Sequence, residues 1–134
     1  MTEKIAHIVN AFTANGEHGN PAGVVLDADG LSKEQMLAIA QQVNLSETAF
    51  VSKSDSANQQ VRFFTSTNEV DLCGHATIAT WSLLKLLGRI TNGGYTQQTL
   101  AGNLAITVQT TLYLCSKHLL FLARPYQMPK WPLC

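Results

Sequence analysis

The sequence predicts an α+β domain, in which short strands and two helices alternate along one chain. Apolar residues recur at i, i+3, i+4 and i+7 from Met36 to Val43, which is typical of a helix that buries one side. A second stretch, Gly74 to Leu87, is rich in Ala and Leu and is followed by Gly88, a residue that commonly ends helices. The segments around these stretches alternate polar with apolar residues and are separated by Gly and Asn, as strands and turns are.

The chain is expected to begin with a strand from Lys4 to Phe12. A loop from Ala14 to Gly23 follows, in which Gly and Pro turn the backbone before Val24 to Leu26 resumes extended structure. Ser32 should open the first helix. Together with Gln35 it has the spacing of a capping box, in which each side chain bonds the other residue's backbone N–H.

Two hairpins are expected beyond the first helix, one on each side of the second. Their strands are predicted at Thr48–Ser52 and Gln60–Thr65, and at Tyr95–Leu100 and Leu104–Val108. The helix between the hairpins is apolar almost all round, and such a helix belongs in the interior of a protein. The pattern is therefore sheet, helix, sheet, buried helix, sheet.

Composition limits the functions open to the chain. Its 134 residues are 46% hydrophobic and 13% charged, which suits one domain with a real core. All nine acidic residues lie at or before Asp71, and five basic residues are spread thinly over the rest. Because those five form no cluster that could follow a phosphate backbone, nucleic acid is excluded as a partner.

The sequence also indicates the compartment. No segment approaches the roughly 20 continuous apolar residues of a membrane span, so no membrane contact is expected. The polar start Thr2-Glu3-Lys4 is unlike a secretory signal. Three cysteines without CxxC spacing argue against a disulfide framework and a zinc ribbon. We expect a cytoplasmic protein with reduced thiols.

Two runs place polar, titratable groups inside otherwise apolar sequence. The first is Asn44 to Phe50, with Glu47 among apolar neighbours and no basic residue nearby in sequence. The second, Glu69 to Thr77, enters the buried helix through Cys73-Gly74-His75. The start of a helix offers free backbone N–H donors and the positive end of the dipole to a carboxylate or enolate. A carboxylate base facing such a helix end suggests proton transfer.

In five segments the sequence resembles the phenazine-biosynthesis, PhzF-type isomerases, which have a diaminopimelate epimerase-like fold. The segments, in the family's order, are Asn10–Thr13, Gly19–Val25, Asn44–Val51, Phe63–Thr65 and Glu69–Ala79. The resemblance implies a mixed sheet wrapped around a central helix. It also implies a cofactor-independent isomerase that acts on a small carboxylate-bearing metabolite. A role in phenazine synthesis itself does not follow from the resemblance.

Members of this family are about twice as long and have a second, similarly folded domain, with the active site between the two. The resemblance therefore implies that residues 1–109 form the N-terminal PhzF-like domain only. Residues 110–134 are atypical, with no acidic residue and three of the four prolines. A shifted reading frame or a divergent C-terminal segment would each produce such a tail, and the former would make the chain a truncated isomerase.

The resemblance also implies roles for individual residues. Glu47 would be the general acid/base, although a solvent-facing glutamate at the start of a strand is the plainer alternative. Gly74 and His75 would contact the substrate, with His75 otherwise a hydrogen-bonded residue of the first helical turn. Asn20 and Ser46 would bind the substrate or hold the loop beside Glu47, and for Asn20 a turn is the simpler role.

Cys73 is open to two interpretations. A thiol beside a helix N-terminus gains thiolate character, and in related epimerases a cysteine at this step is the base. That mechanism needs a second thiol from another domain, which favours Cys73 as a small packing residue. Asp71 could orient His75 or cap the helix. The spacing of His7, His18 and His118 suits no metal, so neither a metal nor an organic cofactor is expected.

Two other classes of function stay open beside the glutamate-dependent isomerase. The chain could be a non-catalytic, one-domain remnant or a dimerisation module, because a missing second domain would leave an apolar, association-prone face. A homodimer formed through that face would not supply the absent domain's residues in their usual arrangement. A cysteine-based epimerase or racemase that uses Cys73 is the third hypothesis.

Overall fold

The computed structural model describes residues 4–11, 20–108 and 115–121. Two helices lie within these ranges, α1 (Lys33–Val43) and α2 (Gly74–Leu86). The strands are β1 (Lys4–Ala11), β2 (Asn20–Val25), β3 (Thr48–Ser52), β4 (Gln59–Phe64), β5 (Glu69–Val70), β6 (Gly93–Thr99), β7 (Gly102–Val108) and β8 (Cys115–Phe121). No helix in this part of the chain is long and apolar enough to cross a membrane.

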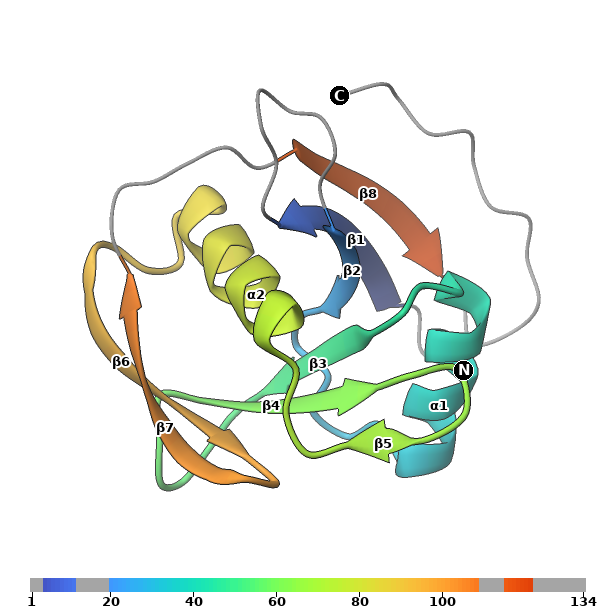
Figure 1. Cartoon of the computed structure of the whole chain (residues 1–134), viewed down its shortest axis with the longest axis horizontal. Coiled ribbons are helices and arrows are strands. Elements are labelled where there is room, and N and C mark those ends of the chain that lie inside the picture. Colours follow the sequence, from blue (N-terminus) through green and yellow to red (C-terminus); the bar gives the residue numbers. More distant parts are fainter. Residues whose placement is uncertain (1–3, 12–19, 109–114, 122–134) are drawn as a thin grey trace.

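The described strands join one mixed sheet. Their order is β7-β6-β4-β3-β2-β1-β8, with β5 paired to β4. The β2/β3 and β4/β6 pairs are parallel and the other pairs are antiparallel. Figure 1 shows the sheet curving around α2, with α1 outside the curve. The expected α+β fold, a mixed sheet wrapped around a central helix, is confirmed.

The sheet buries a separate apolar cluster on each of its faces. Successive side chains of a strand point to opposite faces, so Val24 and Phe63 pack with α2, whereas Val25 and Phe64 pack with α1. On the α1 side the ring of Phe64 meets that of Phe50 edge to face, with centroids 5.4 Å apart. Both helices therefore pack against the same central strands, and these strands fix the positions of the helix ends relative to one another.

Helix α1 forms as its local sequence predicts. The Gln35 N–H donates to Ser32 Oγ at 3.1 Å, and the Ser32 N–H donates to Gln35 Oε1 at 2.9 Å, which completes the capping box. The four residues of the apolar stripe, Met36, Ile39, Ala40 and Val43, are all buried. The helix ends at Asn44, whose left-handed backbone (φ 55°) turns the chain toward β3.

Helix α2 is central but is not buried all round. Its end is the one that Gly88 predicts: Gly88 has φ +76° and donates to Lys85 O, and Arg89 donates to Leu84 O. The expected interior position holds for one side of the helix only, because Ile78 and Leu86 are 41% and 60% exposed. The sheet curves around only part of the helix surface, so the apolar residues outside that part stay uncovered.

The start of β2 differs from the predicted loop. Residues from Asn20 to Gly23 are paired with β1, so the strand begins four residues before Val24. Gly23 does not turn the chain; it permits close packing, since a Cβ there would lie 2.9 Å from Val43 Cγ1 and 3.0 Å from Thr48 Oγ1. The rest of the predicted loop, residues 14–19, lies outside the described residues.

Two strands were not predicted. The first is β5, only two residues long, and the second is β8, which pairs antiparallel with β1 along its whole length. Residues 109–114 and 122–134 lie outside the described part of the chain. The division of the chain at residue 109 stays a prediction.

Candidate active site

Glu47 lies between the turn that ends α1 and the first residue of β3. The Gly23 N–H donates to its backbone oxygen at 3.1 Å, which ties this segment to β2. Further along β3, Ala49 and Val51 belong to the cluster on the α2 side of the sheet. The alternation of side chains therefore sends Glu47 toward α2 as well.

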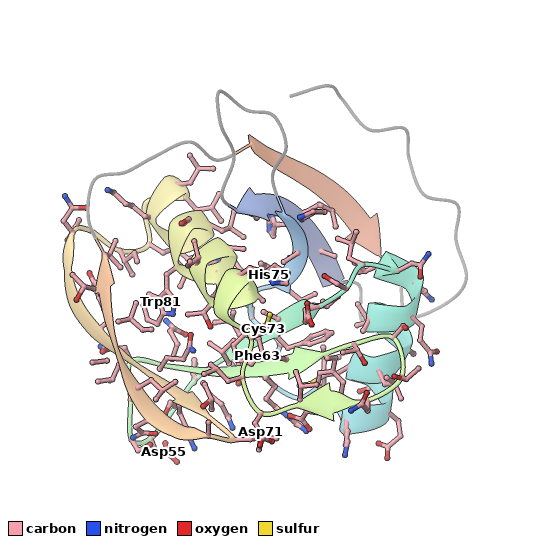
Figure 2. The ribbon with its side chains drawn as sticks, in the orientation of Figure 1. Asp55, Phe63, Asp71, Cys73, His75 and Trp81 are labelled. Carbon is pink, nitrogen blue, oxygen red and sulfur yellow. The ribbon has the colours of Figure 1, made fainter. Side chains whose placement is uncertain are left out.

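The Glu47 carboxylate meets the first turn of α2. Its Oε2 atom lies 3.4 Å from His75 Nε2, and the two side chains are 21% and 14% exposed. Ser46 Oγ is 3.5 Å from the same nitrogen, and Cys73 Sγ is 3.3 Å from His75 Nδ1. Two segments far apart in sequence thus bring three polar side chains together around the His75 imidazole. Figure 2 shows Cys73 and His75 at the start of α2, above Phe63 of the sheet.

Gly74 leaves open space beside this cluster. It is the first residue of α2 and is exposed, and a Cβ built on it would meet no atom of the described residues within 4 Å, its chain neighbours and its own helix backbone aside. The first N–H groups of a helix have no carbonyl partner within the helix, and they carry the positive end of its dipole. The helix start can therefore hold a negatively charged oxygen next to Glu47.

Cys73 is a poor candidate for the base. Burial raises the pKa of its thiol, and the nearby Glu47 carboxylate raises it further, while the N–H groups of Ala76 and His75 offset only part of this. The side chain also packs against the apolar cluster on the α2 side. Burial and the negative charge of Glu47 thus oppose the thiolate character expected of a cysteine at a helix start.

Three other polar residues that the sequence singled out lie apart from the cluster or outside the described part of the chain. Asp71 is exposed, and neither of its suggested roles occurs: the helix has no side-chain cap, and His75 is contacted by other residues. Glu69 instead forms a two-pronged ion pair with Arg62, with both N···O distances 2.8 Å. The side chain of Asn20 lies outside the part that the structure describes, so its role stays a prediction.

Behind the cluster lies a network of hydrogen bonds that the sequence did not predict. Thr77 Oγ1 donates to Cys73 O at 2.8 Å and accepts from Gln97 Nε2 at 3.3 Å, and Trp81 Nε1 donates to Gln97 Oε1 at 2.7 Å. Gln97 is completely buried. This hydrogen-bond network links the start of α2 to β6. A glutamine in a polar strand segment gives no sequence signal of such a role, because its burial arises only when β6 packs against α2.

The chain was compared with known proteins. A family model described as "Phenazine biosynthesis-like protein" (PhzC-PhzF) matches residues 9–125. The uncharacterized isomerase YfhB of Bacillus subtilis is 43% identical over 99 residues, which are 73% of this chain and 34% of that protein. The uncharacterized isomerase YddE of Escherichia coli K12 is 44% identical over 110 residues, 81% of this chain and 36% of that protein.

A solved structure agrees with these matches. The crystal structure of a Bacillus anthracis phenazine biosynthesis protein of the PhzF family superposes with a TM-score of 0.79 at 38% identity, and covers 90% of this chain and 40% of that one. Of the curated relatives named above, the chain spans about a third of their length. The family match, the identities and the shared fold agree: this chain belongs to the phenazine biosynthesis-like, PhzF-type family.

Proposed function

We propose that this chain carries the catalytic glutamate of a cofactor-independent isomerase that acts on a small carboxylate-bearing metabolite. The observation that carries the proposal is the 3.4 Å approach of Glu47 Oε2 to His75 Nε2, beside the open start of α2. The names of the relatives YfhB and YddE, both called isomerases, support the reaction class.

In the proposed reaction Glu47 removes a proton from a carbon of the substrate and returns it to another carbon. Loss of the proton leaves negative charge on the substrate, delocalised onto an adjacent carboxylate or carbonyl oxygen. The backbone N–H groups at Gly74 and His75 would stabilise that charge more in the transition state than in the ground state. The His75 imidazole, held between Ser46 and Cys73, would orient the carboxylate of Glu47.

We also propose that a second, similarly folded domain completes the site in the active protein. This inference is supported by the length of the relatives, of which this chain spans 34% and 36%. Translation of the gene beyond codon 109 in all three forward frames tests it. A continuation that resembles the remainder of YddE supports the inference, and its absence from every frame counts against it.

The experiment for the mechanism is proton exchange in D2O. The chain and a full-length relative such as YddE are each incubated with a panel of small carboxylates, and deuterium at carbon is followed by mass spectrometry. Glu47→Gln, and the matching change in the relative, should lower exchange by about 10²-fold or more, the usual effect of losing a general acid/base. Cys73→Ser should keep the activity that Glu47→Gln loses; the reverse result would support a cysteine-based epimerase.

A second candidate function is an association module without catalysis. The observation that favours it is the set of exposed apolar residues on and beside α2, namely Leu72, Ile78, Leu86 and Leu87, which are 44%, 41%, 60% and 42% exposed. Sedimentation velocity tests this candidate. A dimer that dissociates on Leu86→Asp, with proton exchange absent from both chain and relative, would favour it over the isomerase.

A further inference from the structure

Glu47, Cys73 and His75 bring together three donor types that zinc accepts. One oxygen, one sulfur and one ring nitrogen from these side chains lie within 4.8 Å of one another. Carboxylate, thiolate and imidazole are all common zinc ligands, and thiolate in particular selects zinc over magnesium or calcium. The three residues come from two segments far apart in the chain, so their positions in the sequence show no metal-ligand spacing.

We propose that these three side chains bind one Zn²⁺ ion and that the bound ion inhibits the proton transfer assigned to Glu47. The inhibitory part rests on the proposed function, whereas the binding does not. The ion would take one carboxylate oxygen of Glu47, the sulfur of Cys73 and Nδ1 of His75. The thiol proton of Cys73 leaves to solvent when the Zn–S bond forms.

The spacing of two ligand atoms already suits a shared ion. Zn–S and Zn–N bonds of about 2.3 and 2.0 Å at a tetrahedral angle separate the two ligand atoms by about 3.5 Å. Cys73 Sγ and His75 Nδ1 are 3.3 Å apart. These two residues flank Gly74 at the start of α2, and the helix fixes their spacing, so Zn²⁺ needs to draw in only the Glu47 carboxylate.

The surroundings of His75 support the same assignment. A histidine that binds a metal usually donates its other ring N–H to an oxygen acceptor, which fixes the tautomer. With Nδ1 on the metal, Nε2 carries that proton, and both Glu47 Oε2 and Ser46 Oγ lie near it, at 3.4 and 3.5 Å. Ser46 would remain as the acceptor when the Glu47 carboxylate turns to the ion. The side chains of His75 and Glu47 are partly exposed, which gives the ion a path from solvent.

Three protein ligands leave one tetrahedral position open to water or to a carboxylate. In this respect the site resembles catalytic rather than structural zinc sites, which have four protein ligands. Unlike the metal of a catalytic zinc site, the ion here would not promote the reaction, because it would bind the Glu47 carboxylate that must accept the proton. Bound zinc would therefore lower exchange instead of promoting it.

Cobalt(II) titration of the full chain tests the binding without any activity measurement. Co²⁺ substitutes for Zn²⁺ and reports a sulfur ligand through an intense near-ultraviolet charge-transfer band. We expect one equivalent of Co²⁺ to produce this band and Zn²⁺ to abolish it by displacement. Cys73→Ser should remove the band, and His75→Gln should weaken binding by about 100-fold or more, because loss of a ligand should cost at least as much as the roughly 10–100-fold effect of changing a residue that only supports one.

Two control variants locate the ion. Asp71→Asn changes an exposed carboxylate two residues before Cys73 and should leave the titration unchanged. Cys115→Ser combined with Cys134→Ser removes the other thiols of the chain and should also leave it unchanged. Circular dichroism of each variant establishes that a lost band is not a lost fold.

The binding proposal is overturned if the unaltered chain gives no charge-transfer band, a result that depends on no variant. It is equally overturned if the band survives in folded Cys73→Ser or disappears in the Cys115/Cys134 double variant. The inhibitory part is tested separately in the exchange assay, where adding Zn²⁺ should lower activity and a chelator should restore it. Metal binding in a chain whose exchange does not depend on Glu47 would refute the proposed function and leave the metal site intact.

Discussion

At the scale of single residues, the site depends on which groups the fold allows near the start of α2. The motif predicted that Glu47 faces this helix end, and the 3.4 Å distance to His75 agrees. The same motif could not separate Glu69 from the site, because its partner Arg62 lies on the neighbouring strand. It also could not give the raised pKa of Cys73, since burial of the thiol is a property of the packed structure.

Gly74 permits a test that separates function from folding. Among the described residues, no atom beyond the adjoining backbone lies within 4 Å of a Cβ built there, so Gly74→Ala should leave the free energy of unfolding unchanged or raise it by up to about 1 kcal/mol. The added methyl group would nevertheless fill the space proposed for substrate. We expect at least a tenfold loss of exchange activity with no loss in urea stability.

Gly94→Ala is the matched control for this test, because a Cβ built on Gly94 also meets nothing within 4 Å in the described part of the chain, its chain neighbours aside, but Gly94 lies on β6. It should keep full exchange activity. Full activity in Gly74→Ala would show that no ligand approaches the start of α2 closely and would remove Gly74 from the proposed site.

At the scale of elements, short sequence motifs correctly predicted the features that depend on contacts between residues close together in the chain. The capping box of Ser32 and Gln35 and the end of α2 at Gly88 depend on residues within one or two turns of the chain, and both formed as predicted. The start of β2 was mistaken for a loop because Asn20, Pro21 and Gly23 are typical turn residues. Pairing with β1, a long-range interaction, holds them extended.

Gly23 joins three elements and gives a test at this scale. Gly23→Ala would place a methyl group 2.9 Å from Val43 Cγ1 of α1 and 3.0 Å from Thr48 Oγ1 of β3. We expect a loss of about 1–3 kcal/mol in the free energy of unfolding, as for other overpacked cores. Urea denaturation measures it, with Gly94→Ala as the control in open space; equal stability of the two variants would contradict the packing described here.

At the scale of the whole molecule, stability should depend on pH through the Arg62–Glu69 pair. The hydrogen bonds from Arg62 hold the pKa of Glu69 below its usual value, and the Glu69 side chain is only 6% exposed. Because the folded pKa is depressed, this stabilisation is present above the unfolded value of about 4.3 and is lost as the pH falls through the lower folded value.

Glu69→Gln should therefore destabilise the chain by about 1–3 kcal/mol near pH 7, the cost of losing a buried charged hydrogen bond. The difference from the unaltered chain should shrink as the pH is lowered below about 4.3 and through the depressed pKa of Glu69 in the folded chain. Urea unfolding of both proteins across this range measures it. A difference that stays constant with pH would show that the charge of Glu69 contributes nothing.

The central claim is that Glu47 transfers the proton, and deuterium exchange into small carboxylates tests it most directly. Glu47→Gln keeps the size and hydrogen-bonding capacity of the side chain but removes its basicity. We predict that the variant folds as the unaltered chain does and that exchange, in this chain or in the full-length relative with the matching change, falls by about 10²-fold or more. Exchange that persists in Glu47→Gln and disappears in Cys73→Ser would contradict the account.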